Sequence, residues 1–127
     1  MARRQSVEIS DMEHKSPIPM GCKIGNIIFS SGISGDDPDG GEMSSDPAQQ
    51  AIALMQNIRR FMTAAGGSPE DIIRLTLYVN DKDSRKYFNK EWLEMFPDEH
   101  SRPARHALTA DLGRKKFFQV EIVAVLS

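Results

Sequence analysis

Two charged side chains near the end of the chain are placed where they could form a binding site for a small anion. Arg105 lies in the small, apolar segment 101–109, and Glu121 lies in the aliphatic run 117–126. Both segments predict β-strands, in which alternate residues share a face. A guanidinium held on a strand can bind a carboxylate through two parallel hydrogen bonds. The sequence therefore predicts an anion clamp at Arg105, with Arg102 as a rim or interface residue.

The same arginine also has a purely structural interpretation. Arg105 could pair with Glu121 across two neighbouring strands, and an exposed ion pair of this kind contributes little to stability. Alternation places His106 on the face opposite Arg105, which favours a core or interface histidine over a catalytic base. Taken by themselves, these residues leave ligand binding and ion pairing at Arg105 both open.

No metal site or cofactor site is predicted. The acidic loop 34–46 lacks the alternating ligands of a calcium loop, and turn-forming Asp-Pro and Asp-Gly-Gly explain its composition. His14 and His100 fall in expected loops without partner ligands. Cys22 is the only cysteine, so an internal disulfide is excluded. This thiol is either a small buried residue or a reactive group at the edge of a cleft.

Composition predicts one soluble domain spanning residues 1–127. Hydrophobic residues make up 39% of the chain and charged residues 27%, which is typical of globular proteins with a single core. The formal net charge of −2 gives no general attraction to nucleic acid or to an anionic membrane. No apolar run suits a signal peptide or a membrane span. We therefore expect a cytoplasmic protein with neither nucleic acid nor membrane as a partner.

Hydrophobic periodicity and turn residues predict the elements that position these groups. Residues 1–16 predict a loose arm or a short edge strand. After them we expect the order β-β-α-β-α-β-β, with elements at 20–24, 27–31, 47–65, 73–79, 84–95, 101–109 and 117–126. Helices that follow strands in this order pack on one face of a single mixed sheet.

The second face of this sheet is expected to carry Thr76, Tyr78 and Arg105. These residues are too mixed in character to form a second core. Such a face either meets water or meets other subunits. Oligomerisation is favoured, because a pocket that encloses a small anion needs walls that one bare sheet face lacks.

Several short motifs, taken in order, resemble the RidA family of imine and enamine deaminases, also called YjgF. The resemblance covers residues 17–125 and rests on 25–32, Gln50 with Asn57, 64–66, 71–73, Asn89, 102–105 and 120–122. It implies an α+β fold of the chorismate-mutase-like type. It also implies a homotrimer in which the sheets form a central barrel, with three clefts between subunits.

The resemblance implies a reaction as well. RidA-type enzymes hydrolyse 2-aminoacrylate-like enamines and imines to a 2-oxo acid and ammonia, with no metal or organic cofactor. Arg105 falls on the family's carboxylate-binding arginine, the backbone of Ser31 and Gly32 on a substrate-orienting segment, and Asn89 on the cleft asparagine. The chemistry needs a held carboxylate, an aimed water and a protonated leaving nitrogen.

Three positions depart from the family pattern. Near the C-terminus Glu-Ile-Glu-Ala becomes Glu-Ile-Val-Ala, so Val123 stands in place of a water-orienting glutamate. Glu121 lies roughly 6.5 to 7 Å from Val123 along the strand. It either takes over the orientation of the water or has a structural role. Ala107 replaces a cysteine, and Met20 replaces a tyrosine.

Three functions follow from these observations. The first hypothesis is a deaminase of the RidA type, in which Arg105 and Glu121 are catalytic. The second is a non-catalytic sensor or carrier of small carboxylates, which the change at Val123 favours. The third is a ribonuclease or translation inhibitor, a label historically attached to the family. The negative net charge and the lack of an aromatic-basic stripe argue against the third.

Overall fold

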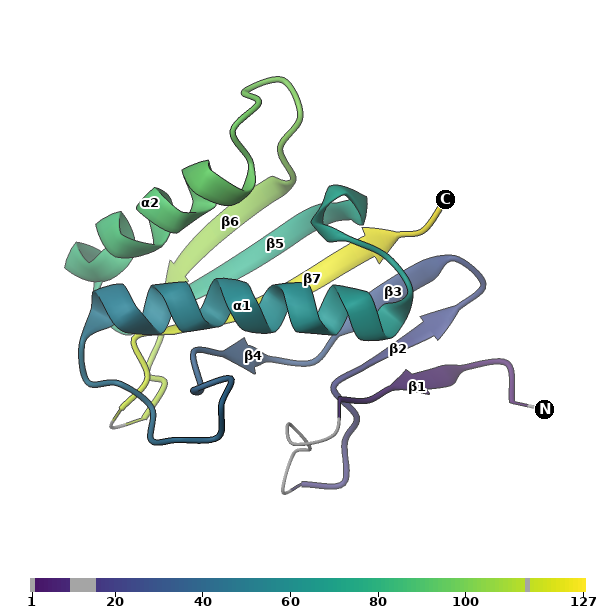
Figure 1. The fold of residues 1–127 in the computed structure, drawn as a ribbon, viewed down its shortest axis with the longest axis horizontal. Helices are drawn as coiled ribbons and strands as arrows, with labels where there is room; N and C mark the ends of the chain where they lie inside the picture. Colours follow the sequence, from purple (N-terminus) through teal and green to yellow (C-terminus); the bar gives the residue numbers. More distant parts are fainter. Residues whose placement is uncertain (1, 10–15, 114) are drawn as a thin grey trace.

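The computed structural model describes residues 2–9, 16–113 and 115–127, so the expectation for His14 lies outside it. The fold is α+β (Figure 1). Its strands are β1 (Gln5–Val7), β2 (Gly21–Ile24), β3 (Ile27–Ser30), β4 (Ile33–Ser34), β5 (Ile72–Val79), β6 (Ala104–Thr109) and β7 (Phe118–Val125). The helices are α1 (Pro47–Ala65) and α2 (Arg85–Met95), with 3-10 turns at Pro69–Asp71 and Lys82–Ser84.

One mixed sheet carries both helices on the same face. Its strand order is β1-β2-β3-β7-β5-β6, and the short β4 pairs with β7. Strands β5 and β6 are parallel and are joined through α2, whereas the other pairs are antiparallel. In Figure 1, α1 and α2 lie side by side over the sheet. The predicted mixed sheet with two helices on one face is confirmed.

Local sequence signals set the ends of the main elements. Asp46 caps α1, because its carboxylate accepts a hydrogen bond from the backbone N–H of Ala48. The helix ends at Gly66, whose φ of 93° is left-handed. Gly25, with φ 58°, begins the turn between β2 and β3. These boundaries match those that the sequence predicts.

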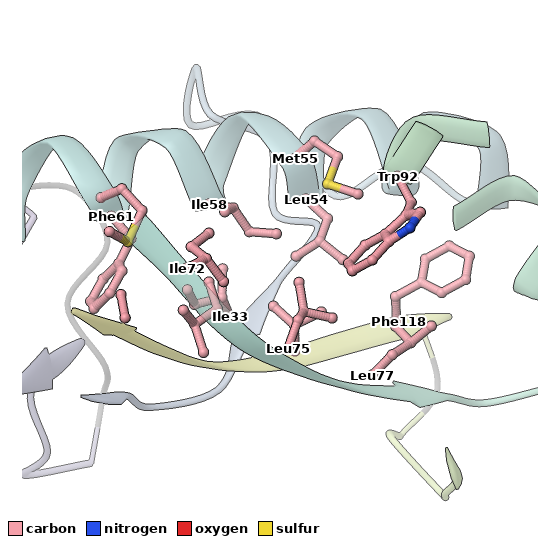
Figure 2. Close-up of a cluster of buried hydrophobic side chains, with 14 of the residues drawn as sticks. Ile33, Leu54, Met55, Ile58, Phe61, Ile72, Leu75, Leu77, Trp92 and Phe118 are labelled. Carbon is pink, nitrogen blue, oxygen red and sulfur yellow. The ribbon is translucent and has the colours of Figure 1, made fainter. Parts of the chain in front are cut away.

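The core lies between the sheet and the two helices (Figure 2). Helix α1 contributes a buried stripe that includes Leu54, Ile58 and Phe61, and α2 contributes Phe88 and Trp92. The sheet meets them with the buried side chains Ile28, Ile33, Ile72, Leu75, Leu77, Val79, Phe118, Val120, Ile122 and Ala124. This packing fixes the position of α2 over the β5–β6 edge of the sheet.

Two expectations about the final strands are wrong. Strand β5 lies between β6 and β7, so Arg105 cannot pair with Glu121 across adjacent strands. Arg105 also lies level with the buried Leu75, on the helix-covered face rather than on the open face with Thr76 and Tyr78. The reason is that β6 is an edge strand. Its helix-facing side is only partly closed by α2 and therefore accepts a charged side chain.

Candidate functional site

Arg105 is held at the edge of the sheet by side chains of α2. Its guanidinium carbon lies 5.1 Å from the ring centroid of Phe88 and 5.1 Å from that of Trp92. Its Nη2 donates a 2.6 Å hydrogen bond to Oδ1 of Asn89. Aromatic rings attract a cation through their quadrupole, and the amide oxygen fixes the direction of the guanidinium. The half-buried cation is therefore rigidly placed before any ligand arrives.

The positive charge of Arg105 has no acidic partner in the described part of the chain. The ion pair found there joins His100 to Glu99 at the surface, and Arg105 has no such contact. Burial lowers the pKa of Arg105, and the nearby positive charge of Arg85 lowers it further. An arginine nevertheless stays protonated in proteins. A small anion entering this edge would therefore meet a partly desolvated cation with spare donors.

Glu121 belongs to a different group of residues, on the open face of the sheet. It is exposed on β7 and lies opposite Thr76 of β5. A hydrogen bond to Glu121 raises the pKa of Tyr78, with smaller contributions from burial and from the glutamate charge. The carboxylate is thus a neighbour of the Tyr78 phenol on the open face, away from the core. It could accept a proton from a water on that side.

The backbone segment of Ser31 and Gly32, which is predicted to orient the substrate, belongs to a bulge next to β7. Phe29 pairs with Val123 and Ile33 with Val120, so three residues (30–32) stand opposite two (121–122). Such a bulge bends a strand and can re-aim its groups toward a site. Ser30 Oγ restores one lost contact by accepting the Ile122 N–H at 2.8 Å.

Within this bulge the groups of Ser31 are already occupied. Its N–H donates to the Met20 carbonyl at 2.7 Å and its hydroxyl to the Pro19 carbonyl at 2.7 Å. A Cβ at Gly32 would collide with the side chain of Gln119, so this glycine permits a close approach between bulge and strand. Gly32 is thus covered by Gln119 on the side where a side chain would lie.

The predicted site residues fall into two groups on opposite faces of the sheet. Arg105 and Asn89 meet between β6 and α2, whereas Glu121 and Gly32 lie along β7 on the open face. Arg102 lies at the surface, where its Nε donates to the Phe96 carbonyl at 2.8 Å. His106 is exposed and faces away from Arg105, as alternation predicts.

Sequence reasoning missed the groups that hold these residues. The two aromatic rings under Arg105 come from Phe88 and Trp92, neither of which the sequence marks as a site residue. The sequence also does not indicate that Arg85 lies near the site. A signal was present, because residues 85, 88, 89 and 92 are spaced to share one side of a helix. The sequence places Arg105 on the other face of the sheet, so it does not indicate that this side of the helix faces the strand of Arg105.

Other features of the described residues add no further catalytic group. A hollow of about 620 Å³ is lined by Glu42, Met43, Ser44, Ser45, Lys115 and Phe117, none of which is a predicted site residue. No cluster of three potential metal ligands occurs within residues 2–9, 16–113 and 115–127. Over these same ranges, neither helix is long and apolar enough to cross a membrane.

Comparisons with known proteins agree over nearly the whole chain. The family described as Endoribonuclease L-PSP matches residues 15–126. A 2-iminobutanoate/2-iminopropanoate deaminase of Escherichia coli (strain K12) is 32% identical over 112 residues, covering 86% of this chain and 87% of that protein. A RutC family protein of Aquifex aeolicus (strain VF5) is 28% identical over 117 residues, covering 87% and 94%. The crystal structure of the E. coli YjgF gene product superposes with a TM-score of 0.86 at 25% identity, covering 97% of this chain and 99% of that one.

Proposed function

Because this chain belongs to the Endoribonuclease L-PSP family, which includes a 2-iminobutanoate/2-iminopropanoate deaminase, we propose that it hydrolyses small 2-imino acids. The products would be a 2-oxo acid and ammonia. The observation that carries this proposal is the state of Arg105. Its cation is half-buried, fixed by two rings and Asn89, and without an acidic partner among the described residues. Such a group suits a substrate carboxylate.

Each step of the reaction has a candidate group in the chain. Arg105 binds the carboxylate next to the C=N bond, and Asn89 keeps the guanidinium aligned. Glu121 accepts a proton from a water as the water oxygen bonds to the imine carbon, and the C=N electron pair moves to nitrogen. Glu121 returns this proton to the nitrogen, which gives a carbinolamine. The carbinolamine hydroxyl then loses its proton through Glu121 to the amine nitrogen, so that a carbonyl forms and ammonia leaves. This proposal needs no metal or organic cofactor.

The site would be completed by a second copy of the chain. Arg105 and Glu121 lie on opposite faces of one sheet and therefore cannot act on one small ligand within a single chain. The open face also exposes Ile27 at 48%, Phe29 at 55% and Leu108 at 38%, which favours contact with other copies. A homotrimer with clefts between subunits accounts for both observations.

The proposal is tested by generating 2-aminoacrylate enzymatically in the presence of semicarbazide, which traps the imine before it hydrolyses spontaneously. The protein should divert the intermediate from the trap to pyruvate, and Arg105→Ala should abolish this effect. The exposed Arg59 on α1 provides a matched control, and Arg59→Ala should act like the parent. Full activity of Arg105→Ala, or no diversion by the parent, would reject the assigned function.

A non-catalytic carboxylate-binding protein is the second candidate. It is favoured by Val123, which fills a position on β7 where the resemblance leads us to expect a glutamate. Under this alternative, calorimetry would detect binding of pyruvate or 2-oxobutanoate that depends on Arg105. No imine would be hydrolysed by the same preparation.

The third candidate is an endoribonuclease, the activity in the name of the matching family. Neither group of site residues includes a basic stripe, and the chain carries a formal net charge of −2. RNA cleavage by highly purified protein, abolished by one substitution in the site, would be required to support it.

A further inference from the structure

Arg85 is a second cation beside the Arg105 site that the proposed reaction does not use. It is the first residue of α2 and stands four residues before Asn89, the side chain that contacts Arg105. Residues four apart on a helix are neighbours on one side of it. The charge of Arg85 reaches Arg105, since it lowers the pKa of that guanidinium. Arg85 therefore lies on the side of α2 that carries Asn89, and Asn89 is the residue that contacts Arg105.

Among the described residues, no acidic or hydrogen-bonding partner explains the position of Arg85. Its Nε is buried and lacks an acceptor among the described residues, and no described carboxylate lies within ion-pairing distance. A buried donor left without an acceptor is destabilising, and so are two like charges close together. The side chain is half-buried overall, and its Nε is packed inside the protein. This arrangement favours an anion supplied from outside the chain.

A small side chain follows Arg105 on the same side of β6. Strands β5 and β6 are parallel and joined by α2, so α2 runs back against both of them. Moving along β6 from Arg105 to Ala107 therefore leads in the direction from Asn89 toward Arg85, and in Figure 1 the start of α2 and the end of β6 both lie toward the left side of the molecule. Ala107 is partly exposed and on the same side of the strand as Arg105. Its methyl group is short and projects less over this side of the strand than a longer side chain would.

We propose that Arg85 binds a second carboxylate of the substrate, so that the site prefers 2-imino dicarboxylates to 2-imino acids with apolar side chains. This inference rests on the proposed function, because it assigns a substrate class to the same site. Arg105 holds the carboxylate next to the imine, and Arg85 holds the one at the far end of the side chain. Arg85 is thus a specificity-determining residue rather than part of the hydrolytic machinery.

The test measures binding of reaction products, so that it does not depend on turnover. Calorimetry compares 2-oxoglutarate with 2-oxopentanoate, which has the same chain length and lacks the second carboxylate. The parent should bind 2-oxoglutarate at least about tenfold more tightly, as expected for one charge-assisted contact. Arg85→Gln should reduce this ratio to about one and leave the Kd of 2-oxopentanoate within about twofold. Arg85→Lys, which keeps the charge, should retain part of the preference.

Lys86 supplies the matched control, because it is an exposed cation on the next position of the same helix. Lys86→Gln should keep the full preference. Equal affinity of the parent for both acids, or equal weakening of both by Arg85→Gln, would overturn the inference. A change of oligomeric state in Arg85→Gln, measured by light scattering, would also overturn it by assigning Arg85 to an interface.

The outcomes for the substrate class and for the reaction can be separated. A dicarboxylate preference that depends on Arg85, without hydrolysis of any imine, would keep the inference as the ligand class of a binding protein and reject the deaminase. Hydrolysis that depends on Arg105, without any such preference, would reject the inference alone.

Discussion

Arg105 and Glu121 project from opposite faces of the sheet, with β5 between their strands. Arg105 lies level with the buried Leu75, whereas Glu121 lies opposite the partly exposed Thr76. Because Leu75 and Thr76 are consecutive on one strand, they point to different sides. A ligand held by Arg105 can meet Glu121 only if that glutamate comes from another copy of the chain.

This relationship predicts complementation between two inactive variants. Arg105→Ala and Glu121→Gln should each lose imine hydrolysis when purified alone. Refolded together at equal amounts, they should recover roughly a quarter of the parent activity, because that share of the sites receives an intact arginine and an intact glutamate from different copies. The imine-trapping assay on the mixture, beside each variant alone, measures the recovery.

A chain that carries both substitutions provides the control for complementation. Mixed with either single variant, it can restore no site, since every site then lacks one of the two groups. Absence of recovery in the first mixture, with mixed oligomers verified by mass spectrometry, would place both groups on one chain or remove Glu121 from the reaction.

Substitution of Arg105 should separate the role of its charge from that of its shape. Arg105→Ala should raise the Kd of pyruvate by at least about 30-fold, since truncating one partner of a buried charged pair costs about 2–5 kcal/mol. Arg105→Lys keeps the charge but loses the planar stacking on Phe88 and Trp92 and the fork geometry. Its affinity should be intermediate. Calorimetry gives both values, and equal Kd values for Arg105→Lys and the parent would mean that shape is unimportant.

The apolar side chains on the open face should support oligomerisation. Phe29 is 55% exposed on β3, and Phe29→Lys would place a charge where other copies are expected to pack. We expect this variant to shift toward monomer in light scattering while its circular dichroism is unchanged. Leu93, which is 52% exposed on α2, is the matched control, and Leu93→Lys should keep the assembly of the parent. If Phe29→Lys behaves like Leu93→Lys, the open face is not an interface.

The main elements could be predicted from the sequence because their signals are local. The cap at Asp46, the terminal Gly66 and the apolar stripe between them define α1 without reference to the rest of the chain. The turn at Gly25 likewise fixes the hairpin of β2 and β3. The two-residue strand β4 was not predicted, since its pairing with β7 depends on the bulge at 30–32. A pairing of this kind has no local signature.

The candidate site was harder to predict, because it depends on which strands are neighbours. The segment around Arg105 and the resemblance both identify this arginine, whereas the resemblance alone identifies Asn89, and a 2.6 Å contact joins the two side chains. The face of Arg105 was assigned wrongly, because a charged residue is normally expected on the side away from the helices. At an edge strand this rule fails, since α2 covers Arg105 with rings and leaves its end accessible.

The titration of Tyr78 provides a direct measure of the Glu121 environment. Hydrogen bonding to Glu121 raises the pKa of Tyr78 above its ordinary value of 10.0, so the folded protein favours the neutral phenol. The stabilisation from this contact is therefore present below pH 10 and is lost as the pH rises through the raised pKa.

The chain has two tyrosines, and in a Tyr87→Phe background Tyr78 is the only tyrosine that titrates. Tyrosinate absorbance should give a midpoint above 10.0, which Glu121→Gln moves down toward that value. Glu94→Gln, at an exposed position on α2, should leave the midpoint in place, and an equal midpoint in all three proteins would mean that Glu121 does not contact Tyr78 in solution.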